Sequence, residues 1–369
     1  MGTFVQIHQL RSFPPHVPNR GADGLAKRAI IGGVERQRIS SQCSKYALRH
    51  HASTLDLAEQ LGVGMSIRST LIGERVVVPA LEAEGVAEAR AWSDAVMALW
   101  RADSKGKKAS DDEAGAQPIV IGQQEVRLLV AVIKELATAG KSPDDLRHLI
   151  EKKLPKDTPD PIRQATEAFK AARSAAGLDG ALFGRFATGV AVSNVHRAIT
   201  VGEMLTTHAM TPIADFFSAV DELKDIGAGE TGGGHINTRE LGGGLFYRHD
   251  VVDVEQVKQN LSVDGVGAAS VVAWAVKAAY ETCPVLDRAH SAVVDMMVEV
   301  GPDAPRSLFG AFNGPVAAPG EAVDTFKAYV ADRDALDGAP GHRFWLRDHR
   351  EQPPAYQALA AAVAHTIGQ

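Results

Sequence analysis

The chain has few cysteines and no long apolar run. Its 369 residues include only two cysteines, Cys43 and Cys283, which lie far apart and outside any C-x-x-C pair. This spacing indicates neither a disulfide framework nor a thiolate zinc site. The best apolar stretch, residues 266–280, contains Lys277 and is shorter than the ~18 to 20 residues that a membrane span needs. Since the first residues also lack the basic and apolar blocks of a signal peptide, we expect a cytoplasmic protein with no membrane partner. The spacing of the cysteines leads us to expect no metal.

The sequence also lacks the common motifs of nucleotide-binding and hydrolytic enzymes. No Walker A, H-E-x-x-H or G-x-S-x-G motif occurs in it. Residues 227–232, G-A-G-E-T-G, match the dinucleotide-binding pattern G-x-G-x-x-G. That pattern must follow a strand and open a helix, whereas residues 216–225 read as a helix. A flexible hinge is therefore the preferred interpretation of these glycines.

Positive charge is concentrated in one segment of an acidic chain. The formal net charge is −6, which argues against a protein whose whole surface coats nucleic acid. Between residues 20 and 49, seven basic residues stand against two acidic ones. Residues 12–37 are rich in proline and glycine and are expected to form a long loop, with Gly32-Gly33 allowing a ligand to approach the backbone. The sequence therefore predicts an acidic protein with one basic strip.

A helix from residue 42 to 51 is expected to carry the end of this basic strip. Ser40-Ser41 provides its N-cap, and the hydroxyls lie where backbone N–H groups favour anions. One face carries residues spaced i, i+3 and i+7, which are Gln42, Lys45 and Arg49. A solvated surface is the commoner meaning of two basic residues on a helix, but the adjoining loop favours an anion-binding site.

The pattern of the remaining residues predicts an α+β fold. Strands are expected at 3–10, 182–192, 199–208, 241–254, 292–300 and near 307–312, and further helices at 266–282 and from 355. Residues 55–177 read as a helical insertion, clearest at 81–100 and 124–139. Without the insertion, the order strand, helix, strand, strand, helix, strand is that of a ferredoxin-like or RRM fold, which presents a sheet and its loops to RNA.

Two further segments carry aromatic residues that are candidates for contact with RNA bases. In residues 183–189, two phenylalanines flank an arginine on an expected strand, and such rings can stack on RNA bases or belong to the core. The core is favoured for Phe183. Residues 209–239 are expected to be an irregular excursion with a short helix bearing Phe216 and Phe217, which would be stable once docked, either on its own chain or on the next subunit. One of these two rings would anchor the loop and the other would wedge against a base, and the sequence leaves open which does which.

Several of these segments together resemble the CasC backbone family of the type I-E CRISPR Cascade complex. The resemblance rests on Asn19-Arg20, Lys27, Ile31-Gly32-Gly33, Arg38 to Gln42, Lys45, residues 184–188, Thr206-Thr207-His208, residues 216–223 and residues 244–248. It implies an RRM-like palm at 1–54 and 178–369, helical fingers at 55–177 and a thumb at 209–239. Several copies would polymerise along one CRISPR RNA and leave its bases to pair with target DNA.

By position, the resemblance also implies two sets of site residues and a set of partners. The RNA contacts are Arg20, Lys27, Arg38, Ser40, Gln42, Lys45, Arg49, Phe186, Ala187, Thr188 and Gly189, and the thumb or assembly residues are Thr207, His208, Phe216 and Phe217. The implied partners are CRISPR RNA, other copies of the chain, the large, small and guide-end Cascade subunits, and target DNA through the guide. No catalytic residue is implied, and no cofactor besides the bound RNA. Tyr46 stands where the family often has Arg, which removes one cation.

Two enzyme hypotheses compete with this interpretation. In the first, the chain is a backbone subunit of a target-RNA-cleaving complex, and the loop aspartate Asp23 assists metal-dependent cleavage. A lone loop aspartate is more often a turn former, which makes this the weaker hypothesis. In the second, a nucleotide-dependent metabolic enzyme uses the glycine-rich residues 227–232, and it would bind a free dinucleotide tightly.

Overall fold

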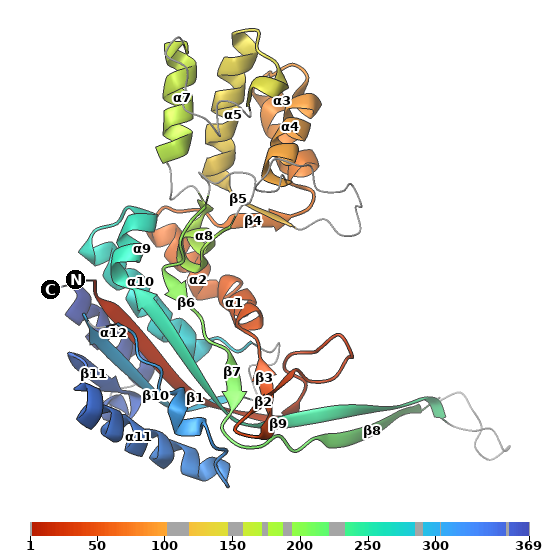
Figure 1. The fold of residues 1–369 in the computed structure, drawn as a ribbon. Helices are drawn as coiled ribbons and strands as arrows, with labels where there is room; N and C mark the ends of the chain where they lie inside the picture. Colours follow the sequence, from red (N-terminus) through yellow and green to blue (C-terminus); the bar gives the residue numbers. More distant parts are fainter. Residues whose placement is uncertain are drawn as a thin grey trace.

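One antiparallel sheet forms the centre of the molecule (Figure 1). The computed structural model describes residues 2–101, 118–146, 158–171, 176–186, 194–220, 233–284, 291–302, 304–351 and 354–368. The strand order is β11-β10-β1-β9-β7-β3-β2, with β6 and β8 also paired to β9. The strands are β1 (Phe4–His16), β2 (Arg28–Ile31), β3 (Val34–Ile39), β6 (Ile199–Thr200), β7 (Met204–Thr206), β8 (Ile213–Val220), β9 (Gly233–Asp253), β10 (Ala292–Gly301) and β11 (His342–Trp345).

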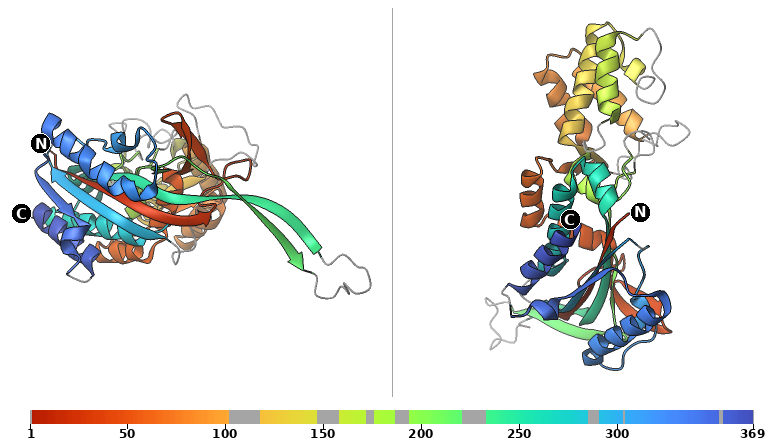
Figure 2. Two further views of the ribbon diagram at one scale, coloured as in Figure 1. Left: turned by 90° about the horizontal axis from the view of Figure 1, so that it is seen from below. Right: turned by 90° about the vertical axis from the view of Figure 1, so that its left-hand side faces the viewer.

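Helices cover both faces of this sheet, which follows from the alternation of apolar side chains along its strands (Figure 2). Val5 and Ile7 of β1 belong to a core with the helices of one face, whereas Leu10 belongs to a second core with Phe326 of the opposite face. The first face carries α1 (Ser41–Arg49), α2 (Ala52–Gln60), α8 (Leu178–Phe183), α9 (Val254–Leu261), α10 (Gly265–Glu281) and α12 (Ala355–Gly368). The second carries α11 (Ala322–Asp337) and short 3-10 helices at Phe309–Phe312 and Pro319–Glu321. A further 3-10 helix, Leu346–His349, follows β11 and packs on the first face.

The central strands confirm the expected α+β, ferredoxin-like palm. In chain order, β1 is followed by α1, then β6 and β7, β9, α10 and β10. In the sheet, β10, β1, β9 and β7 lie side by side in that order and pair antiparallel. The first and third strands of the motif are therefore central and the second and fourth flank them, as in a ferredoxin-like fold.

The fingers form a separate helical layer above the palm (Figure 1). A π-helical turn at Gly73–Val77 leads to α3 (Val78–Ala83) and α4 (Ala89–Arg101), and α5 (Gln123–Thr138) and α7 (Asp160–Ala171) complete the layer. The short hairpin β4 (Ser66–Ser69) and β5 (Ile119–Gly122) lies at its base. Leu81, Trp92 and Ile133 belong to an apolar core of its own. The exact limits 55 and 177 remain predictions. Helix α2 crosses the first limit and packs on α10 of the palm.

The thumb is a β-hairpin, and the expectation of an irregular segment with a short helix was wrong. Residues of β8 pair with the first half of β9, from Ile213 opposite Leu241 to Val220 opposite Gly233. The aromatic residues occur at a spacing that suits a helix, but β-branched and aromatic side chains also favour strands, and cross-strand pairing decides between them. The hairpin projects away from the palm in Figures 1 and 2.

Three other sequence expectations were wrong. Residues 12–37 are no structureless loop, because they contain the end of β1 and the hairpin β2–β3, for which Gly32 and Gly33 form a two-residue turn with φ of 64° and 76°. Residues 182–192 do not begin as a strand, since α8 runs to Phe183. The expected strand near 307–312 is a 3-10 helix.

In the part of the chain that the structure describes, no single helix is long and apolar enough to span a membrane. The pair α9 and α10 reaches the necessary length and hydropathy only when joined, and its two helices are bent by 116°.

Candidate nucleic-acid interface

Helix α1 begins at a cap that Ser40 forms, supported by Asn19 of the preceding loop. The Ser40 hydroxyl accepts a hydrogen bond from the Cys43 N–H at 3.4 Å, and Asn19 Oδ1 accepts one from the Ser40 N–H at 3.0 Å. Ser40 is buried, so its side chain is committed to starting the helix. In the structure the hydroxyl has this local role. A contact from it to RNA stays a prediction.

The expected ridge on α1 is divided between the surface and the interior. Gln42 is exposed and Lys45 is half-buried, whereas the guanidinium of Arg49 is held by other residues of the protein. Arg49 Nε lies 2.6 Å from Asp179 Oδ2, and Arg49 Nη2 donates to the Ser66 carbonyl at 2.6 Å. Arg49 therefore joins α1 to α8 and to the base of the fingers, and its contact with RNA stays a prediction.

The loop side chains are likewise partly engaged. Arg20 is exposed and donates to the Gly24 carbonyl at 2.9 Å, which orders the turn around it. Arg38 makes a two-pronged contact with Glu203, and hydrogen bonding to this carboxylate raises the pKa of Arg38. Lys27 is half-buried. The strip thus offers Arg20, Lys27 and Lys45 as cations, while Arg38 meets a carboxylate of the same chain.

Phe186 projects from the palm and is not a core residue. Its side chain is 81% exposed. The preceding residue, Arg185, is buried and makes a two-pronged ion pair with Glu125 of α5, with Nη2 to Oε1 at 3.0 Å. Phe183 packs partly buried against the palm core, as expected. Ala187, Thr188 and Gly189 lie outside the described residues, so an aromatic wedge at Phe186 is the testable part of that prediction.

The thumb residues fall into two groups. Thr207 is fully buried and His208 lies at the root of the hairpin, where the Leu245 N–H donates to His208 Nε2 at 3.3 Å. A side chain on Gly244 would collide with this imidazole, since a Cβ there would be 2.0 Å from His208 Nε2. These two residues hold the root of the hairpin together, and their role in assembly stays a prediction. Phe216 is 66% exposed on β8, and the Arg239 guanidinium lies 5.6 Å from the Phe217 ring centre.

One cation whose charge affects Lys45 was missed in the sequence. Arg197 is exposed just before β6, and Lys45 feels its charge, because burial first and Arg197 second lower the pKa of Lys45. The available signal was His196-Arg197, a pair of basic side chains directly before an expected strand. Because this pair lies far from the basic strip in the sequence, its relation to Lys45 could not be predicted.

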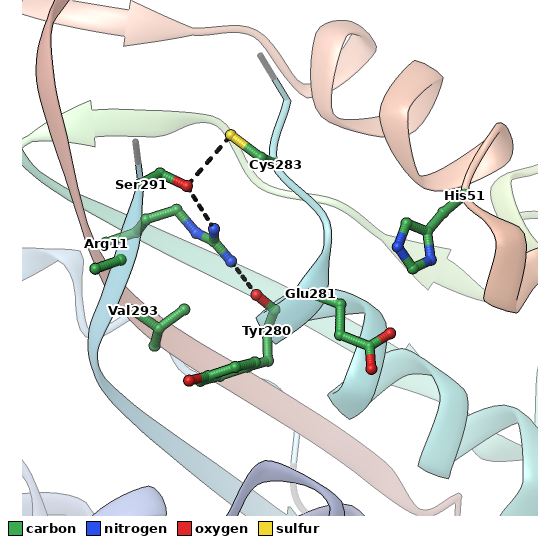
Figure 3. Close-up of a pocket in the computed structure, with 8 residues that line it drawn as sticks. Arg11, His51, Tyr280, Glu281, Cys283, Ser291 and Val293 are labelled. Carbon is green, nitrogen blue, oxygen red and sulfur yellow. Dashed lines mark hydrogen bonds between the residues drawn. The ribbon is translucent and has the colours of Figure 1, made fainter. Parts of the chain in front are cut away.

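A cavity of about 610 Å³ near the end of α10 contains a buried arginine (Figure 3). The Arg11 guanidinium donates to the Ala279 carbonyl at 3.1 Å, to the Tyr280 carbonyl, and to Ser291 Oγ at 3.0 Å. Burial and the nearby Arg248 lower the pKa of Arg11 to about 10. Since Arg11 caps the negative end of the helix, its charge is already used within the fold.

The residues of the enzyme hypotheses were also located where the structure allows it. Asp23 is exposed, and its Oδ1 accepts the N–H of Leu25 at 3.0 Å, so the carboxylate closes its own turn. The glycine motif at 227–232 lies outside the described residues. Over the described ranges, no group of three or more His, Cys, Asp or Glu side chains could hold a metal ion.

Comparisons with known proteins extend over nearly the whole chain. A family model described as CT1975-like protein matches residues 5–368. The chain is similar to a chain of a solved "CRISPR RNA-guided surveillance complex, pre-nicking", with a TM-score of 0.71, 24% identity and coverage of 99% of this chain and 100% of that chain. A chain of a second solved "CRISPR RNA-guided surveillance complex" gives a TM-score of 0.64, 21% identity and coverage of 98% and 99%. No curated protein matches the sequence. The structural likenesses confirm the fold that the resemblance to CRISPR backbone subunits implied.

Proposed function

This chain belongs to the CT1975-like protein family, and on that premise we propose that it is a guide-RNA-binding backbone subunit of a Cascade-type CRISPR surveillance complex. The single observation that carries the proposal is the match along nearly the whole chain, palm, fingers and thumb together, to chains of RNA-guided surveillance complexes. A shared palm alone would be weak support, because one fold serves many functions. More specifically, we propose that the complex is of type I-E and that the protein is located in the cytoplasm.

The surface chemistry supports a role in holding the RNA backbone. Lys27 and Lys45 lie half-buried on or before α1, and Arg20 is exposed in the loop before it. Contacts from such cations to phosphates add affinity that does not depend on base sequence. Phe186 supplies an exposed ring, which can stack on any base. Sequence specificity is then left to base pairing between the guide and its target DNA.

The thumb supports a role in polymerisation. A two-stranded hairpin that projects from its domain has little core of its own, and here Phe216 and Ile213 are exposed. Docking of each thumb on the next copy of the chain would bury these side chains. Such a head-to-tail contact repeats along the RNA and forms a filament. The large, small and guide-end subunits of the complex would then bind to this filament.

We further propose that the chain itself does not cleave nucleic acid. The Asp23 carboxylate is engaged in its own turn, which favours a structural role. Incubation of the assembled complex with complementary RNA and Mg²⁺ should leave that RNA intact. Evenly spaced cuts that disappear in Asp23→Ala would make the chain an RNA-cleaving subunit instead.

The proposal predicts that the purified chain carries RNA. A high ratio of absorbance at 260 nm to that at 280 nm should fall after RNase treatment but not after DNase treatment, and the extracted RNA should have a uniform length. Tight binding of a free dinucleotide with no co-purified RNA would overturn the proposal in favour of a metabolic enzyme.

A further inference from the structure

The hairpin of β2 and β3 is bound firmly to the palm on one of its faces. Gly32 in its turn lies against Asn313, since a Cβ on Gly32 would be 1.9 Å from the Asn313 carbonyl oxygen. Arg36 of β3 is fully buried, and its guanidinium donates to the Thr206 carbonyl at 2.8 Å and to the Phe312 carbonyl at 2.9 Å. Displacement would leave this buried guanidinium without hydrogen bonds, which is costly. The hairpin is therefore a fixed part of the palm.

The other face of this hairpin contacts the root of the thumb, which leaves the palm beside it (Figure 1). Because side chains alternate along paired strands, Arg28 of β2 and the buried Arg36 of β3 face opposite sides. Arg28 Nη2 lies 2.5 Å from Glu240 Oε1, and Glu240 of β9 pairs with Ala214 at the base of the thumb. Arg28 Nη1 lies 3.1 Å from Glu35 Oε2 of β3. One guanidinium thus joins both strands of the fixed hairpin to β9.

The other side of the thumb root is joined to the same hairpin by the backbone. The Met210 N–H, shortly before β8, donates to the Glu35 carbonyl at 2.7 Å. In addition, Gly242 of β9 passes close to Gln37 of β3, where an added Cβ would be 2.7 Å from Gln37 Oε1. The thumb is therefore attached to the hairpin on both of its strands, and two attachments restrict its direction more than one would.

Arg28 lies in the basic strip, yet carboxylates of the same chain occupy its guanidinium. Its side chain is 28% exposed, and that of Glu240 is 21% exposed. Partial removal from water strengthens such a pair, and each of its hydrogen bonds is charge-assisted. Two carboxylates around one cation also leave no excess positive charge for a phosphate. Arg28 is thus suited to holding the thumb root and not to binding RNA.

We propose that Arg28 is a positioning residue that fixes the direction in which the thumb leaves the palm, so that the thumb is aimed at the next copy before the chains assemble. The inference rests on the proposed function for what the thumb binds, whereas the positioning itself is a property of the single chain. A thumb that swings freely spends only part of its time in the direction that docking requires. Its apparent affinity for the next copy is then reduced by that fraction.

The direct test measures the direction of the thumb in the full, RNA-free chain by pulsed electron spin resonance. Spin labels are placed on two exposed residues, one in the thumb and one on α2, through Thr238→Cys and Asp56→Cys. The two natural cysteines are replaced beforehand, as Cys43→Ser and Cys283→Ala. The chain with Arg28 intact should give a narrow distribution of distances between the labels, and Arg28→Gln should give a broader or shifted one. The same distribution in both would overturn the inference.

Matched variants separate this role from a general loss of charge. The reversed pair Arg28→Glu/Glu240→Arg should restore the narrow distribution that Arg28→Gln loses. Arg333→Gln removes a partly exposed ion pair with Asp337 on α11, away from the thumb, and should leave the distribution unchanged. Should Arg28→Gln fail to fold, Glu240→Gln removes the same contact from the thumb side and spares the pair between Arg28 and Glu35.

Assembly on RNA tests the consequence of this positioning. On a long guide RNA, Arg28→Gln should raise the protein concentration needed for half-assembly by about three- to tenfold, because each docking must first order the thumb. On an RNA too short for two copies, its affinity and its salt dependence should equal those of the wild type. A salt slope smaller by about 0.7 on the short RNA would mean that Arg28 binds a phosphate, and would overturn the inference.

The failures of the two proposals are distinguishable. If the wild type binds no RNA, the proposed function fails, while the spin-label distances still decide whether Arg28 directs the thumb. If the wild type assembles on RNA and Arg28→Gln assembles equally well with the same distances, only this inference is overturned. A lower melting temperature of Arg28→Gln with unchanged distances would show that the ion pairs merely stabilise the palm, which also overturns it.

Discussion

Strand β9 passes through two environments, and the contrast between them separates what holds the fold from what serves assembly. In the palm, Leu245, Phe246 and Tyr247 are buried between the helical layers. In the thumb, Thr238 and Arg239 of the same strand are exposed, as is Phe216 on the paired strand. Both halves have the same ladder of backbone hydrogen bonds. Hydrogen bonding therefore builds the thumb, but among the described residues of β9 only those of the palm lie in an apolar core, and the exposed thumb aromatic residue needs a partner surface to become buried.

The largest expected effect is the loss of core packing in the palm. Phe246→Ala should lower the free energy of unfolding by about 3 to 5 kcal/mol, because Phe246 is fully buried against Phe13 and Ile39. Phe216→Ala should change it by less than about 0.5 kcal/mol. Urea unfolding of both variants measures the difference. Equal costs would mean that the thumb has a core of its own and would break the comparison.

Acid should destabilise the palm through a stacked pair of histidines, of which His8 is buried and His249 half-buried. His8 and His249 stack with ring centres 4.3 Å apart, and burial lowers the pKa of His249 to about 4 and that of His8 well below its usual value. Because the unfolded chain protonates these groups near pH 6.5 and the folded chain does not, stability is full above that pH and falls as the pH drops toward 4. His249 alone accounts for roughly 3 kcal/mol at pH 4.

Unfolding followed at several pH values tests this, with His249→Gln as the control. The variant lacks the titrating group and should lose less stability between pH 6.5 and 4 than the wild type. An equal loss in both proteins would show that other groups control the acid response.

Ion pairs extend the comparison to charged residues. Arg49→Ala leaves the Asp179 carboxylate buried without its cation, since that side chain is only 7% exposed. The variant should lower the free energy of unfolding by about 2 to 3 kcal/mol. The two hydrogen bonds that Ser66 still donates to the carboxylate limit the loss. The matched thumb variant, Arg239→Ala, removes the exposed pair with Asp215 and should cost no more than about 1 kcal/mol. A cost for Arg49→Ala as small as that for Arg239→Ala would return Arg49 to the list of free RNA-binding cations.

The smallest effect on folding should accompany a strong effect on assembly. The double variant Phe216→Ala/Phe217→Ala should unfold within about 1 kcal/mol of the wild type, yet it should fail to form regular complexes on guide RNA. Sedimentation velocity with and without RNA measures the assembly. Particles of normal size would show that the thumb aromatics do not dock on another copy.

The sequence predicted the parts of this molecule that depend on local pattern. The Ser40 cap, the long apolar helix α10 and the strand-like residues 241–254 at the end of β9 are all local features, and the order of elements in the palm followed from them. The strand β8 was missed because Phe216, Phe217 and Val220 also suit a helix, and pairing with β9 is not local. The Gly32-Gly33 turn was a hairpin signal that its proline-rich surroundings concealed.

The candidate site was harder to predict, because charge pairing is decided by tertiary contacts. Nothing near Arg49 in the sequence reveals that Asp179 will meet it, and nothing near Lys45 points to Arg197. The sequence identified cationic residue types in a specific order. The structure divides them into those that hold the palm together and those that remain available to a ligand.

The most direct test of the proposed backbone role is the mass of the assembly as a function of RNA length. The purified, RNA-free chain would be mixed with synthetic guide RNAs of increasing length and weighed by native mass spectrometry. A repeating backbone subunit predicts that the number of bound copies rises in regular steps, one copy for each constant increment of RNA. A fixed number of copies at every RNA length, or no binding at all, would contradict the account.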